Sequence, residues 1–155
     1  MIHKNSKRCL ICIGNQNRGD DGVALLIARN LQQGKKHSFT IFTQTGEMGE
    51  LMDTWQGYDE VSIVDAMSSG SPAGSLQVFD VARHALPCRS RNSSTHAFGL
   101  YEALELARVL GRMPKKISVY GIEGKNFSLG ETVSPDLQKR VHDLAQKILR
   151  EFEHA

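Results

Sequence analysis

The chain has 155 residues, 40% of them hydrophobic, which fits one domain with a single substantial core over residues 1–155. Its formal net charge of +2 is too small to indicate binding to nucleic acid or to a membrane surface. No run of about 18 apolar residues occurs, so no transmembrane helix is expected. The basic N-terminus is not followed by a signal-peptide core with a cleavage site, and we therefore expect a cytoplasmic protein.

Strands and helices are predicted to alternate along the chain. Apolar runs and helical spacing of hydrophobic residues give the predicted elements in order: a strand over 8–14, a helix over 20–32, a strand over 38–43, a helix over about 47–56, strands over 61–65 and 76–81, a helix from about 96 to 110, a strand over 117–122, and a last helix that starts at Ser134-Pro135. This pattern predicts an α/β three-layer sandwich, with a mostly parallel five-stranded sheet and helices on both faces.

One connection is too short for a crossover helix. The turn-rich segment 66–74 joins the strands over 61–65 and 76–81, so we expect the latter strand to be antiparallel or at an edge of the sheet.

Three cysteines are too few for a disulfide framework. Cys9 and Cys12 match a CxxC pattern, but both lie in the predicted first strand. Side chains three residues apart on a strand point to opposite faces, so a shared metal ion or a disulfide is disfavoured. We predict two buried free thiols.

The first strand-to-helix turn holds glycines and two adjacent carboxylates. Asp20 and Asp21 follow Gly19 at the predicted start of a helix, at the mouth of the sheet where α/β proteins bind ligands. The pair could cap the helix, with the second carboxylate solvated, or it could form part of a site. The segment Gly14–Gly19 lacks GxGxxG spacing, and the carboxylates would repel a pyrophosphate, so nucleotide binding is disfavoured.

Three polar residues from distant parts of the chain are predicted to converge. Asp21 follows the first strand, Asp65 ends the third, and His96 begins the third helix. Loops leaving the ends of parallel strands meet at one edge of the sheet. Two carboxylates and an imidazole suit zinc, nickel or a similar divalent ion. Each residue alone also has an ordinary structural explanation, as a strand-end cap or part of a helix N-terminus.

Short segments along nearly the whole chain form an ordered set. They are Ile13-Gly14-Asn15 with Gly19–Val23, Val64-Asp65-Ala66, Thr95–Leu100, Tyr120–Glu123 and Ser134-Pro135. In order and spacing this set resembles the motifs of the hydrogenase maturation endopeptidases, which process the large subunit of [NiFe] hydrogenases.

The resemblance implies an aspartic-type endopeptidase that removes the C-terminal extension of a hydrogenase large-subunit precursor once nickel is installed. Asp21, Asp65 and His96 match the family's metal-contacting residues and are the implied catalytic and metal residues. The implied nickel is carried by the precursor, so the enzyme itself would be metal-free at rest. Zinc or another divalent ion is the alternative. We expect a monomer whose partner is the precursor.

Several questions stay open at this stage. Many family members have an Asp-Gly-Gly-Thr-like segment after the second strand, whereas this chain has Gln44 and Glu47 there, which leaves their roles undefined. Asp20 is expected to cap a helix, with orientation of His96 or a water as the alternative. The glycines of the first turn would let a metal-bearing partner come close. Arg89 and Arg91, in the long segment before the third helix, are either solvated or dock the precursor.

Two other functions fit the same residues. A non-catalytic checkpoint protein would bind the nickel-loaded precursor without cutting it. A self-contained zinc hydrolase would act on small amides, although no general-base motif accompanies the three residues.

Overall fold

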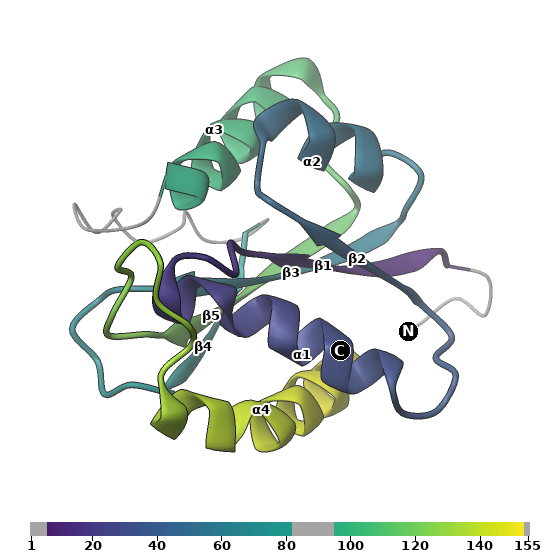
Figure 1. Ribbon diagram of the computed structural model, residues 1–155. Helices are drawn as coiled ribbons and strands as arrows, with labels where there is room; N and C mark the ends of the chain where they lie inside the picture. Colours follow the sequence, from purple (N-terminus) through teal and green to yellow (C-terminus); the bar gives the residue numbers. More distant parts are fainter. Residues whose placement is uncertain (1–5, 82–94, 154–155) are drawn as a thin grey trace.

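The computed structural model describes residues 6–81 and 95–153, with the backbone alone for 95–99. Its elements in chain order are β1 (Arg8–Ile13), the short 3-10 helix η1 (Gly19–Gly22), α1 (Val23–Gln32), β2 (Thr40–Gln44), α2 (Met48–Trp55), β3 (Glu60–Met67), β4 (Leu76–Asp80), α3 (Thr95–Leu110), β5 (Lys116–Glu123) and α4 (Pro135–Glu153). Strands and helices alternate as the hydrophobic pattern predicts (Figure 1).

The strands form one five-stranded sheet in the order β2-β1-β3-β5-β4. The β1–β2, β1–β3 and β3–β5 pairs are parallel, whereas β4 pairs antiparallel with β5. The prediction of a mostly parallel α/β sheet is confirmed. The strand after the short connection is both antiparallel and at an edge, because a connection without a crossover helix cannot return the chain to run parallel.

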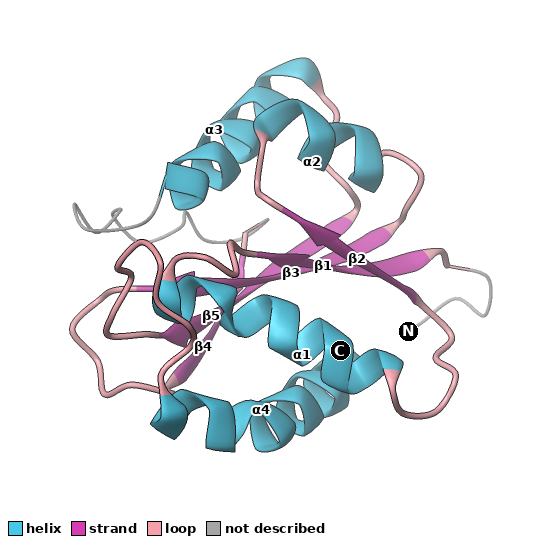
Figure 2. Ribbon diagram, viewed as in Figure 1, coloured by secondary structure: helices cyan, strands magenta, loops and turns pink. Residues whose placement is uncertain are grey.

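Two helical layers cover the sheet, one on each face (Figure 2). Helices α1 and α4 pack together on one face, and α2 and α3 pack together on the other. Each layer buries its own hydrophobic cluster against alternate residues of the central strands. Within the described residues, no helix has both the length and the apolar character needed to cross a membrane.

The helix predicted over 20–32 begins differently from the expectation. Its first turn is the 3-10 helix Gly19–Gly22, and the α-helix proper is Val23–Gln32. The Asp21 amide donates to the Arg18 carbonyl, the i to i−3 bond of a 3-10 turn. Hydrophobic spacing does not separate this tight turn from the α-helix that continues it.

The second strand is Thr40–Gln44 rather than 38–43. Its parallel register with β1 runs from Cys9 opposite Thr40 to Ile13 opposite Gln44. The partner strand therefore decides where β2 starts and ends, which a loose alternation of apolar residues does not.

The two strand cysteines lie in different cores, as predicted. Cys9 belongs to the cluster under α2 and α3, and Cys12 to the cluster under α1 and α4. Both are free, and burial raises the pKa of each thiol to about 12. The reactive thiolate form is therefore scarce at neutral pH.

We predict that both thiols resist alkylation in the folded protein. Native protein treated with iodoacetamide at pH 8 should leave Cys9 and Cys12 unmodified, while protein in denaturant is alkylated fully, as read by peptide mass spectrometry. Rapid labelling of either residue in the native protein would contradict the burial described here.

Candidate functional site

The turn after β1 folds back over the end of its own strand. A Cβ on Gly14 would lie 2.4 Å from the carbonyl oxygen of Asp21, so only glycine allows this approach. The Gly14 amide also donates to the Gln44 carbonyl, which ties the turn to β2. The close approach that Gly14 permits is therefore intramolecular. It places Asp21, which is fully buried, against the carboxyl end of β1.

Asp65 lies on the next strand of the sheet, near the same edge. The β1–β3 pairing runs to Cys12 opposite Val64, the residue before Asp65, and η1 contacts β3. Strand alternation puts Asp65 on the same face as Ile63, which packs in the cluster under α2 and α3. Asp65 is only 5% exposed. The structure thus brings Asp21 and Asp65 to neighbouring elements at one edge, as predicted.

The third predicted residue is in the first turn of a helix on that face. His96 is the second residue of α3, and Figure 1 shows the start of α3 at the same end of the molecule as η1 and the loop between β5 and α4. The His96 side chain lies outside the described residues, as do Arg89 and Arg91. Among the described side chains, no three His, Cys, Asp or Glu residues form a group that could hold a metal ion.

Asp20 has a different role from its neighbour. Its Oδ2 accepts hydrogen bonds from the amides of Lys125 (2.8 Å) and Asn126 (3.1 Å), and its Oδ1 accepts one from the Ser134 amide (2.8 Å). Gly22, not Asp20, is the N-cap residue of α1. The expected capping of this helix by Asp20 is therefore wrong. Its carboxylate instead holds the loop between β5 and α4.

These hydrogen bonds govern the ionisation of Asp20. Burial opposes the charged form, but donors from Lys125, Ser134 and Asn126 outweigh it and hold the pKa of the carboxyl below its usual value. Asp20 is fully buried and ionised, and the dipoles of the three backbone amides stabilise its charge.

A second buried carboxylate fixes the loop that follows Asp65. Glu123, at the end of β5, is 2% exposed. Its Oε1 accepts hydrogen bonds from the amides of Ser69 (2.8 Å) and Gly70 (3.0 Å), and its Oε2 accepts one from the Ser69 hydroxyl (2.8 Å). Asp20 and Glu123 each stabilise one loop at the edge that holds Asp21 and Asp65.

The residues that depart from the family pattern make structural contacts. The Gln44 side-chain amide donates to the Thr54 hydroxyl and so joins β2 to α2. Glu47 caps α2, accepting from the amides of Gly49 and Glu50, both at 2.9 Å. These contacts position α2 on the sheet.

A family model described as hydrogenase maturation protease, HycI, matches residues 26–151, well over half of the chain. The chain belongs to the hydrogenase maturation protease family. It is therefore an enzyme of the peptide hydrolase class. A comparison with curated protein sequences gives no match.

Solved structures share the fold of this protease. The hydrogenase maturating endopeptidase HybD from E. coli superposes with a TM-score of 0.78 at 20% identity, over 96% of this chain and 93% of that chain. The [NiFe] hydrogenase maturation protease HycI from Thermococcus kodakarensis has a TM-score of 0.68 at 22% identity, over 92% and 90%. A hydrogenase 2 maturation peptidase from a Thaumarchaeota archaeon has a TM-score of 0.67 at 19% identity, over 94% and 97%.

We predict that Asp20→Asn destabilises the protease. An asparagine oxygen can accept from the Lys125 and Asn126 amides, but its NH₂ group then faces the Ser134 amide, which is also a donor. The free energy of unfolding should fall by about 2–3 kcal/mol, the cost of a buried donor without an acceptor. Urea unfolding measures the change, and the exposed Asp53→Asn is the matched control.

The effect of Asp20 should depend on pH. Its pKa is lower in the folded protein than in the unfolded chain, so its stabilisation is present above the unfolded value, about 3.9, and is lost as pH falls through the folded value. The difference in unfolding free energy between wild type and Asp20→Asn should narrow between pH 6 and pH 3. A difference that stays constant would contradict the hydrogen-bonded carboxylate.

Glu123→Gln should be tolerated, in contrast to Asp20→Asn. The side-chain oxygen of the glutamine can still accept hydrogen bonds from the Ser69 and Gly70 amides. The glutamine NH₂ group can donate to the Ser69 hydroxyl, which rotates to accept. We expect a loss under about 1 kcal/mol for Glu123→Gln and about 2–3 kcal/mol for Glu123→Ala, measured by urea unfolding. Equal losses in the two variants would mean that this loop needs the negative charge.

Proposed function

We propose that this protease removes the C-terminal extension of a [NiFe] hydrogenase large-subunit precursor after nickel insertion. The observation that carries the proposal is the pair of buried carboxylates at the carboxyl edge of the parallel strands. Asp21 is fully buried and Asp65 is 5% exposed, on elements in contact with each other. Membership in the hydrogenase maturation protease family supports a peptide bond of a hydrogenase subunit as the substrate.

In this proposal nickel belongs to the substrate. Asp21 and Asp65 offer carboxylate oxygens and His96 offers an imidazole nitrogen, a donor set that suits nickel. Asp21 and Asp65 are both buried, and a divalent cation bound by both carboxyl groups gives their negative form a partner of opposite charge away from water. A precursor that carries nickel is therefore bound more tightly than one without it, which gates cleavage by the state of the substrate.

The bound ion also places the substrate for hydrolysis. Coordination by three residues from η1, β3 and α3 orients the nickel-bearing segment relative to the sheet edge. The scissile carbonyl is then polarised by the ion, or a water is activated beside it. A resident zinc ion would supply the same chemistry without the gating, so the two versions differ in the substrates that they accept.

The gating predicts that only nickel-loaded precursor loses its tail. Purified protease should be mixed with precursor prepared with and without nickel, and the precursor mass measured over time. Equal trimming of both forms would contradict gating. A stable complex with no loss of mass would indicate a checkpoint protein, and stoichiometric zinc with cleavage of simple amides would indicate a zinc hydrolase.

Removal of a proposed nickel ligand should abolish most of the activity. We expect Asp21→Asn, Asp65→Asn and His96→Ala each to lower kcat/KM on nickel-loaded precursor by about 100-fold or more, the scale seen when a key electrostatic group is removed. The free energy of unfolding should not fall in parallel.

Exposed residues provide matched controls for these variants. Asp53→Asn on α2 and His142→Ala on α4 make the same chemical changes on the surface and should leave cleavage unchanged. Full activity in Asp21→Asn or His96→Ala would overturn the assignment of the site.

A further inference from the structure

Two loops beside Asp21 are joined along their backbones. One is residues 15–20, after β1, and the other is residues 125–131, after β5. The Gly19 amide donates to the Glu131 carbonyl (2.9 Å), and the Gly130 amide donates to the Asn17 carbonyl (2.6 Å). We call these two segments the loop pair. The two loops are far apart in the sequence, and they lie side by side at the edge of the sheet that holds the candidate site.

Glycines let the loop pair pack without intervening side chains. A Cβ on Gly19 would lie 2.2 Å from the Asn126 carbonyl oxygen, and Gly19 has φ +58°, in the region that favours glycine. A Cβ on Gly124 would lie 2.7 Å from the Asp20 Cβ. The Asp20 carboxylate holds the base of the second loop through the Asn126 amide and its neighbours. These contacts fix the shape of the loop pair in the folded protein.

This fixed loop carries a bare hydrophobic side chain. Leu129 is 74% exposed, and Gly130 follows it with φ +85°. Of the large exposed hydrophobic side chains in the described part of the chain, Leu129 belongs to the loop pair. The others lie elsewhere: Val78 on the edge strand β4, and Leu106, Val109 and Leu110 on the second half of α3. Because the loop is already ordered by its hydrogen bonds, binding of a partner over Leu129 loses little conformational entropy in fixing the loop.

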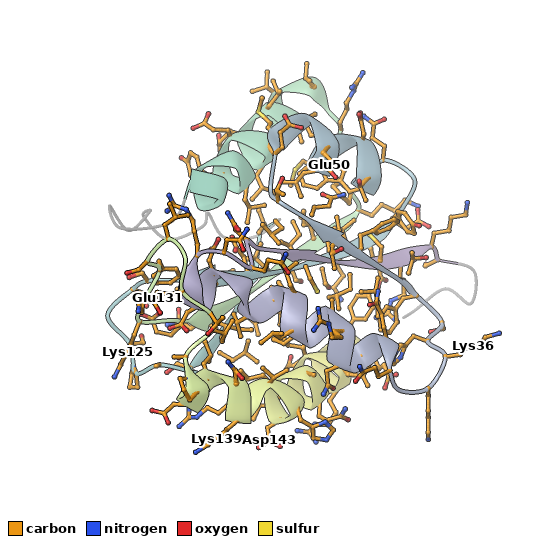
Figure 3. The ribbon with its side chains drawn as sticks, in the orientation of Figure 1. Lys36, Glu50, Lys125, Glu131, Lys139 and Asp143 are labelled. Carbon is orange, nitrogen blue, oxygen red and sulfur yellow. The ribbon has the colours of Figure 1, made fainter. Side chains whose placement is uncertain are left out.

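Charged residues of both signs flank Leu129. Figure 3 shows Lys125 and Glu131 on the same loop, at the end of the molecule where η1 lies. Both are exposed. An apolar centre with a polar rim of mixed charge is the usual composition of a protein-binding patch.

We propose that Leu129 is a docking residue for an apolar side chain of the hydrogenase precursor, an inference that rests on the proposed function. The hydrogen bond from Gly130 to Asn17 couples the leucine to the segment that leads into Asp21. The precursor is thereby held at two points in a fixed relation, by its nickel at the carboxylates and by an apolar anchor at Leu129. Leu129 does not touch the reacting atoms, so its contribution is to binding and not to the chemical step.

The test separates binding from chemistry. Leu129→Ser should raise KM for nickel-loaded precursor about tenfold with kcat within about twofold, because the buried apolar contact is lost before reaction. Leu129→Met keeps an apolar side chain and should retain the wild-type KM. Leu110→Ser makes the same change at a 52% exposed leucine at the end of α3 and should leave both constants unchanged.

Affinity for nickel-free precursor, measured by fluorescence anisotropy, distinguishes this inference from the proposed function. Leu129→Ser should weaken that affinity about tenfold relative to wild type and to Leu110→Ser, whether or not any variant cleaves. Absence of cleavage by the wild type would overturn the proposed function. Unchanged affinity and KM in Leu129→Ser, or equal losses in Leu110→Ser, would overturn the docking role of Leu129.

Discussion

The buried carboxylate of Asp20 is the interaction on which the candidate site depends. It accepts backbone hydrogen bonds from Lys125, Asn126 and Ser134, residues more than a hundred positions away. An ionised group is stable without water there because oriented amides replace its hydration. The loop after β5 and the start of α4 are thereby fixed to η1. The backbone of Asp21, the next residue, is therefore restrained by the contacts of Asp20 on one side and by its close approach to Gly14 on the other.

The order of the parallel strands is the second feature that positions the candidate site. In the order β2-β1-β3-β5, the parallel strands end at one edge, and the segments that leave this edge carry the candidate site residues. Asp21 comes from the segment after β1, Asp65 from β3, and α3 begins at the same end (Figure 1). The sheet order therefore makes neighbours of residues far apart in sequence, while Glu123 restrains the segment that leaves β3.

Much of this fold follows from local patterns. Apolar runs give the strands, helical spacing gives the helices, and the short link before β4 gives its direction. The placement of Asp21 and Asp65 on neighbouring elements is also predictable, because it requires only that parallel strands share an edge. The role of Asp20 is not, since its partners are backbone amides, and an amide is present in nearly every residue. No side-chain pattern in the sequence marks which amides a carboxylate will reach.

The roles of the two residues that depart from the family pattern, Gln44 and Glu47, were equally hard to predict from the sequence. Gln44 and Glu47 lie where a substrate-related role was left open, yet the structure gives each a partner on α2. A glutamate whose side chain reaches the amides two and three residues further on is recognisable as a cap only after the helix boundary is known. That boundary moves by one residue between prediction and structure. Prediction of side-chain roles is thus limited by the accuracy of helix ends.

Two adjacent aspartates point in different directions within the 3-10 turn Gly19–Gly22. With three residues per turn, successive side chains point about 120° apart around the axis. When Asp20 is directed at the loop before α4, Asp21 must be directed elsewhere, and Gly14 allows its backbone to rest on the end of β1. The contacts of Asp20 with the loop before α4 and the close approach at Gly14 together separate an anchoring carboxylate from the proposed nickel ligand.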